Sequence, residues 1–128
     1  MHLQKISKTI ISALEYIRKA KDAHFKEDEK EVIWLTWRAS SDLEYGLFLF
    51  ALDTQEEYLS ASWKLPVLKH AKIESLLSNT QKSLKEALKN FELEDLEEAY
   101  KKTWTAKGQL LQIHDLFEKK RKTQKNHS

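Results

Sequence analysis

The chain has 128 residues, which is enough for one domain with a hydrophobic core and too few for two. Its two glycines, one proline and lack of cysteine exclude a turn-rich all-β fold, a disulfide framework and a thiolate metal site. The net charge of +2 is unevenly distributed, because residues 119–128 carry five positive charges and no acid, while the rest holds 17 basic and 20 acidic side chains. The sequence therefore predicts an acidic body, residues 1–118, with a basic C-terminal tail.

The N-terminal segment lacks the pattern of a signal peptide, because Lys5 interrupts the place where an apolar region would run. The longest apolar run, residues 46–52, is far shorter than the roughly 20 residues that span a bilayer. We therefore expect a soluble, cytoplasmic protein that does not bind membranes.

Residues 5–50 and 72–117 resemble two copies of one helical hairpin, offset by 67 positions. They share 12 identities in 46 positions, against roughly three to four expected from composition. The shared residues of the first copy are Lys5, Ile6, Ala20, Glu27, Asp28, Glu31, Thr36, Trp37, Ala39, Leu43, Leu49 and Phe50. The repeat predicts an all-α protein built by tandem duplication.

Each copy carries two apolar stripes whose spacings alternate between three and four residues, as in helices packed near 20°. In the first copy the stripes run from Leu3 to His24 and from Val32 to Phe50. Asp28 and Asp95 stand where each second helix needs an N-cap. We predict an up-and-down four-helix bundle, in which both acidic turns lie at the same end.

The connection between the copies, residues 53–65, is predicted to form a short helix or an ordered loop that packs back on the bundle, because it is too apolar for a free linker. Pro66 fits the first turn of the third helix, where its missing N–H costs nothing. Trp37 and Trp104 occupy equivalent positions and are expected to close the core symmetrically.

The copies differ most at the end of the second helix, where Tyr45–Leu52 is apolar on every face while its counterpart in the second copy is apolar on one side. Such a segment must be covered, either by residues 54–68 or by another chain. The leading hypothesis is a non-catalytic interaction protein that associates with itself or with a partner protein. The candidate contact residues are Leu47, Phe48, Leu52, Tyr58 and Trp63.

The basic tail provides an alternative function, nucleic-acid binding through contacts with phosphates that weaken as salt rises. The candidate residues are Lys119, Lys120, Arg121, Lys122 and Lys125. Aromatic residues do not alternate with these cations, so the pattern gives no indication of base stacking.

A further alternative comes from Arg18 and His24, whose R-x5-H spacing resembles the Arg…His motif of the HEPN ribonucleases. Those enzymes are also small helical bundles, and the resemblance implies ribonuclease activity with these two residues in the active site. It covers two residues and the helical character of the chain. The histidines lack the spacings of metal ligands and no glycine-rich phosphate loop is present, so we expect no metal, no cofactor and no enzymatic activity.

Overall fold

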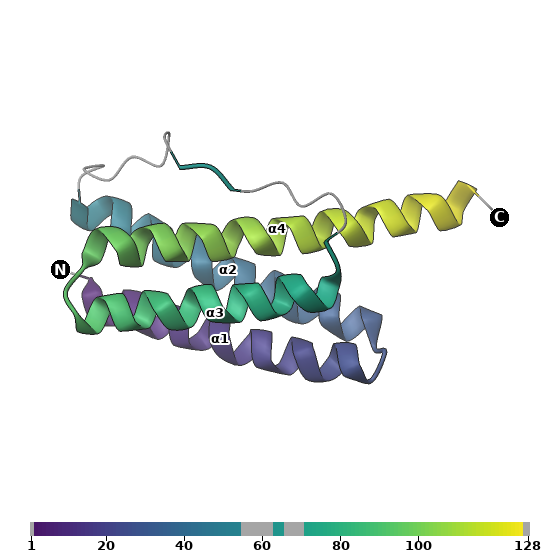
Figure 1. Cartoon of the computed structure of the whole chain (residues 1–128), viewed down its shortest axis with the longest axis horizontal. Helices are drawn as coiled ribbons and strands as arrows, with labels where there is room; N and C mark the ends of the chain where they lie inside the picture. The colour runs from purple at the N-terminus through teal and green to yellow at the C-terminus, as the bar shows by residue number, and fades with distance from the viewer. Residues whose placement is uncertain (1, 55–62, 66–70, 127–128) are drawn as a thin grey trace.

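The computed structural model describes residues 2–54, 63–65 and 71–126, and in this part of the chain it contains four α-helices and no strand (Figure 1). The helices are α1 (Leu3–Phe25), α2 (Glu29–Thr54), α3 (Ile73–Glu92) and α4 (Leu96–Asn126). The predicted all-α bundle is thereby confirmed. Within the predicted connection, residues 53–54 end α2 and residues 63–65 are not helical, whereas Tyr58 lies outside the described residues. Pro66 also lies outside them, but α3 begins at Ile73, so the prediction that Pro66 stands in its first turn is wrong.

The order of the helix directions differs from the prediction (Figure 1). Phe50, near the end of α2, stacks on Phe91, near the end of α3, with 5.4 Å between the ring centroids. Tyr100, near the start of α4, lies 4.9 Å from the same Phe50 ring. The helices α2 and α3 thus end at the same end of the bundle, and the expected up-down-up-down order is wrong: the directions are up, down, down, up.

The central connection is long enough to allow this topology. Residues 55–72 separate α2 from α3. At about 3.3 Å per residue they are long enough to return along the roughly 39 Å length of α2. A short connection would have forced α2 and α3 to be antiparallel, but this one permits either direction.

The resulting bundle has only antiparallel neighbours, since α1 packs against α2 and α3, and α4 packs against the same two helices. The two acidic turns consequently lie at opposite ends, not at one end as predicted. Glu27 and Asp28 line a cavity with Ile73, at the start of α3, whereas Glu94 lines a different cavity with Leu3, at the start of α1.

Most residues of the predicted stripes are buried in the core, together with Leu35, Leu49 and Leu76, whereas the predicted stripe residues Leu3, His24, Ile73, Phe91 and Phe117 are only half-buried. Buried stripe residues are Ile6, Ile10, Ala13, Ile17 and Ala20 in α1; Val32, Thr36, Ala39, Leu43, Gly46 and Phe50 in α2; Leu77, Thr80, Leu84 and Ala87 in α3; and Ala99, Thr103, Ala106, Leu110 and Ile113 in α4. The hydroxyls of Thr36, Thr80 and Thr103 donate to the carbonyl four residues earlier at 2.7–2.8 Å, which satisfies these buried polar groups.

The turns of the two hairpins have the same geometry, although neither contains glycine. In the first, the N–H of Glu27 donates to the His24 carbonyl at 3.0 Å and that of Asp28 to the Ala23 carbonyl at 2.9 Å, which is a Schellman motif. Asp28 then caps α2, its side chain accepting from the Glu31 N–H at 3.3 Å. The second turn repeats this arrangement with each residue 67 positions later, including the Asp95 cap.

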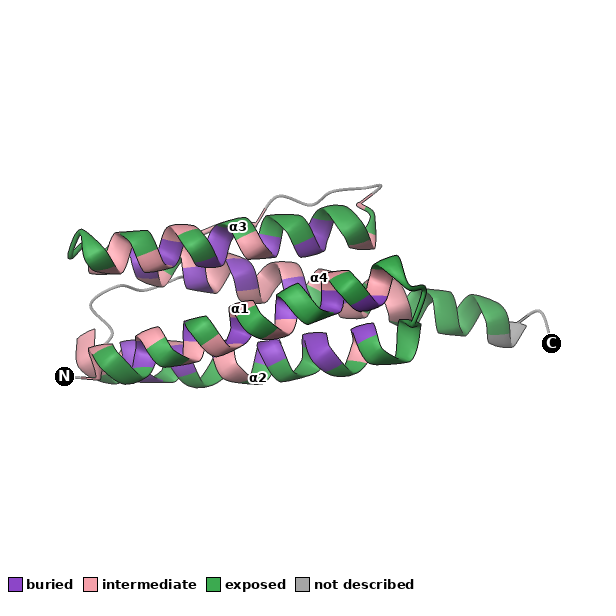
Figure 2. Cartoon of the chain, turned by 90° about the horizontal axis from the view of Figure 1, so that it is seen from below, coloured by how far each residue is buried: buried purple, intermediate pink, exposed green. Residues whose placement is uncertain are grey.

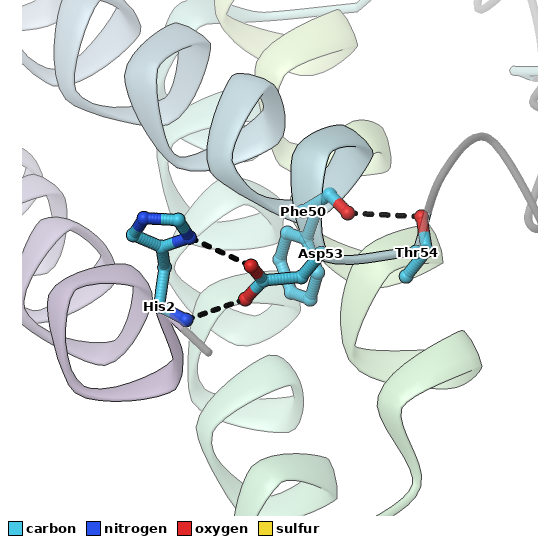
Figure 3. Close-up of polar contacts among 4 residues, drawn as sticks. All are labelled: His2, Phe50, Asp53 and Thr54. Atoms are coloured by element: carbon cyan, nitrogen blue, oxygen red, sulfur yellow. Dashed lines mark hydrogen bonds and ion pairs between the residues drawn. The ribbon is translucent and has the colours of Figure 1, made fainter.

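A polar contact fixes the start of α1 to the end of α2 (Figure 3). The backbone N–H of His2 donates to Asp53 Oδ2 at 2.6 Å, and the His2 Nδ1 atom lies 2.6 Å from Oδ1. The backbone hydrogen bond is the main reason that the pKa of Asp53 is lowered, and the ring contact of His2 adds to it. The ionised carboxylate therefore helps to close this end of the bundle.

The turns generate a stability prediction, because Glu27 and Glu94 adopt φ of 59° and 60°, a conformation that favours glycine. Glu27→Gly and Glu94→Gly should each raise the free energy of unfolding by about 0.5–1 kcal/mol, since the left-handed strain removed exceeds the added chain entropy. The sites lie at opposite ends, so the double variant should show the sum of both gains. Chemical denaturation measures the change, with Glu→Ala at each site as the matched control that removes the carboxylate but keeps Cβ. Lower stability of the glycine variants than of the alanine variants would contradict the assignment.

Candidate functional site

The outward face of α2 carries a row of large apolar side chains that the bundle does not bury. These are Trp34, Trp37, Tyr45, Phe48 and Leu52, each between 49% and 57% exposed. With 100° per residue they fall within an arc of about 80° on the helix surface. We call this row the α2 stripe. The opposite face of α2 contributes nine buried residues to the core, so the helix is apolar on two faces.

Two of the predicted contact residues, Phe48 and Leu52, belong to the α2 stripe. Leu47 is half-buried and packs against the core, and Tyr58 lies outside the described residues. Trp63 lies on α4, where its ring is 5.3 Å from that of Tyr100. The described part of the connection therefore packs back on the bundle as predicted, but it packs against α4 and leaves the end of α2 exposed.

Trp37 does not close the core, and that prediction is wrong. It is 54% exposed and stacks on the imidazole of His114, with 4.2 Å between the centroids and 12° between the planes. Trp37 follows the buried Thr36, and one residue of helix rotates the side-chain direction by about 100°. The indole therefore lies at the edge of the α2–α4 contact and not in the core. Its counterpart Trp104 is half-buried, because Trp63 covers it at 5.6 Å.

A groove of about 550 Å³ runs beside Trp37 between α2 and α4. Its apolar part comprises Ile33, Trp37, Leu111 and Phe117, and its charged rim comprises Glu29, Asp115, Glu118 and Arg121. His114 also lines it. Lys120 pairs with Glu29 and Arg121 pairs with Glu118, so cations of the same chain offset two of the three rim carboxylates.

His114 fixes one wall of this groove. Its Nε2 atom lies 3.1 Å from the Thr36 hydroxyl, whose own hydrogen is donated to a backbone carbonyl, so Nε2 carries the proton as donor. Nδ1 is buried without a hydrogen-bond partner. Desolvation lowers the pKa of His114, although the nearby Asp115 acts in the opposite direction. The neutral ring is therefore the form that joins α2 to α4.

The edge of the α2 stripe nearest α1 is held by aromatic and cationic contacts. The rings of Tyr16 and Trp34 meet edge to face at 6.3 Å. The guanidinium of Arg38 lies 5.7 Å from the centroid of each ring. These contacts orient Trp34 while leaving its outer surface accessible.

The predicted tail is part of a helix in the structure. Residues 119–126 form the last two turns of α4, which project past the other helices (Figure 2). Lys120 pairs with Glu29 at 2.9 Å and Arg121 pairs with Glu118, so acids of the same chain offset part of the positive charge. Lys119 and Lys122 are exposed, whereas the side chain of Lys125 lies outside the described residues. Nucleic-acid binding by these residues stays a prediction.

The resemblance to HEPN ribonucleases gains no geometric support. Arg18 pairs with Glu15 and with Asp22 and is exposed, whereas His24 is half-buried beside the cavity at the start of α3. Six residues of helix place the two side chains about 120° apart. They do not converge on one site. Among the described residues no group of three or more His, Asp or Glu side chains has an arrangement that could hold a metal ion.

Comparisons with known proteins leave the site to be interpreted from its own geometry. No protein-family model, no curated protein and no solved structure matches the chain. None of the helices within residues 2–54 and 71–126 is both long and apolar enough to cross a bilayer.

The environment of His114 predicts how stability depends on pH. Its pKa in the folded protein lies below the ordinary 6.5, so the unfolded chain binds the proton more readily. The contribution of the neutral ring should be complete above about pH 6.5 and decrease as the pH falls through that value towards the folded pKa. Unfolding free energies measured at several pH values should show a smaller acid loss in His114→Leu than in the wild type, with the other four histidines as a common background. Equal losses in both proteins would contradict the assignment.

Proposed function

We propose that the protein is a non-catalytic interaction module that binds another polypeptide through the α2 stripe. The observation that carries this proposal is that five large apolar side chains are half-exposed in one row on a helix whose other face is already in the core. Large apolar side chains that gather on one exposed helix face are typical of sites where proteins associate. Four of the five side chains are aromatic, and aromatic residues are enriched in protein interfaces.

The shape of the stripe favours a polypeptide over a small molecule. From Trp34 to Leu52 the stripe extends for about 27 Å along the helix. Small-molecule sites are concave and enclose most of their ligand, whereas the α2 stripe lies along an exposed helix face and borders a groove beside Trp37. The polypeptide is either a second copy of the chain or a different protein, and the two are separable by mass in solution.

The internal repeat supports a further part of the proposal, namely that the two hairpins arose by duplication. Both copies have the same Schellman turn and the same aspartate cap, and most of their equivalent stripe positions are buried in both. At the positions equivalent to the α2 stripe, α4 has Lys101, Trp104, Gln112, Asp115 and Lys119, so an outward apolar row is present in one copy and absent from the other. The α2 stripe is then a feature that distinguishes the copies.

Introducing charge on the α2 stripe tests the proposed function. Phe48→Glu with Leu52→Glu should leave the helix content unchanged, since both side chains are about half exposed, and should weaken association at least about tenfold. The matched control is Ser78→Glu with Asn79→Glu, at exposed positions of α3. Light scattering measures self-association, and quantitative capture from the native host measures other partners.

The expected result is that a dimer or a specific captured protein is lost in the α2 variant and kept in the α3 control. A monomeric protein whose captured partners are the same for the wild type and both variants would contradict the proposed function.

A further inference from the structure

The structure contains one example of an apolar segment seated on an outward helix face, and it is the chain's own. Trp63 rests edge to face on Tyr100 and Trp104, at 5.3 Å and 5.6 Å between centroids. Two residues later, Leu65 fits against Gly108 so closely that a Cβ there would lie 2.7 Å from Leu65 Cδ2. The seat on α4 thus has two aromatic residues followed by a glycine, each four positions apart.

The equivalent positions of α2 form a similar seat, on which the described residues place no comparable segment. Subtracting the 67-residue offset of the repeat gives Ile33, Trp37 and Ser41, two apolar residues followed by a small one. Ile33 and Trp37 line the groove of about 550 Å³, and Trp37 is 54% exposed. Ser41 is exposed and adds only a hydroxymethyl group where α4 has glycine.

The spacing of the seat selects the conformation of its occupant. Four residues of helix advance about 6.0 Å, and two residues of extended chain advance about 6.6 Å. Side chains at positions i and i+2 of an extended segment therefore match positions i and i+4 of the helix, as Trp63 and Leu65 match Trp104 and Gly108. In a helical occupant, side chains two residues apart point in directions about 200° apart, so they do not both face the seat.

We propose that Ile33, Trp37 and Ser41 bind a non-helical segment of a different protein, in which an aromatic residue and a leucine stand two positions apart. This inference rests on the proposed function and names the kind of partner. A second copy of the chain is disfavoured, because its Trp63 segment is already seated on its own α4.

The probe is a synthetic peptide with the sequence of residues 61–67, titrated into the full-length protein. Calorimetry should give one peptide per chain, and amide NMR shifts should centre on residues 33–41. Ser41→Arg should weaken binding by about tenfold or more by filling the seat, while the control Ser78→Arg should bind as the wild type does. A peptide with alanine in place of both tryptophan and leucine should not bind.

A second variant tests the equivalence of the two seats. Trp63→Ala with Leu65→Ala removes the chain's own cover from α4, so the same peptide should then bind at two sites, with new shifts around residues 100–108. No binding of the peptide at millimolar concentration, binding centred away from α2 in the wild type, or insensitivity to Ser41→Arg would each overturn the inference. If the peptide fails while Phe48→Glu with Leu52→Glu still abolishes an association, this inference falls and the proposed function stands.

Discussion

The antiparallel packing of α2 against α4 is the constraint on which the site depends. The long central connection allows α2 and α3 to run in the same direction, and α2 is then antiparallel to α4. Thr36 and His114 meet across this contact at 3.1 Å, and the small residues Ala39 and Ala106 are fully buried in the core. Positions that are equivalent in the repeat, such as Trp37 and Trp104, consequently lie towards opposite ends of the α2–α4 contact. Each of them borders an outward-facing surface.

This arrangement explains why two similar helices have different surfaces. On α4 the platform around Trp104 is covered by Trp63, so its apolar surface is used inside the chain. On α2 the platform around Trp37 borders a groove, and the apolar row continues through Phe48 to Leu52. Exposed apolar area gives no stability to the folded chain, whereas each Å² removed from water on binding contributes about 25 cal/mol before the costs of association. We therefore interpret the α2 stripe as the proposed binding surface for a partner.

The sequence was sufficient to predict the elements whose causes are local. The aspartate caps and the 3-4 stripes depend on neighbours within a few residues, and the structure has both where they were predicted. The directions of α3 and α4 were mispredicted, since a connection of this length is compatible with both topologies. Trp37 was wrongly predicted to lie in the core. A residue next to a buried stripe position can point either into the core or out of it, and the sequence pattern does not decide between the two. The row through Trp34 and Tyr45 could have been found by plotting α2 as a helix, since 100° per residue places them with Phe48 and Leu52.

If the α2 stripe serves a partner, it is exposed in the isolated protein and covered in its native setting. Hydroxyl-radical footprinting of the protein, alone and in extract from its native host, measures this directly. Trp34, Trp37, Tyr45 and Phe48 should be protected in the extract. Ile11 and Leu93, which are 55% and 68% exposed but lie off the stripe, should be labelled equally in both. Equal labelling of the stripe with and without extract, or protection confined to Ile11 and Leu93, would contradict the account.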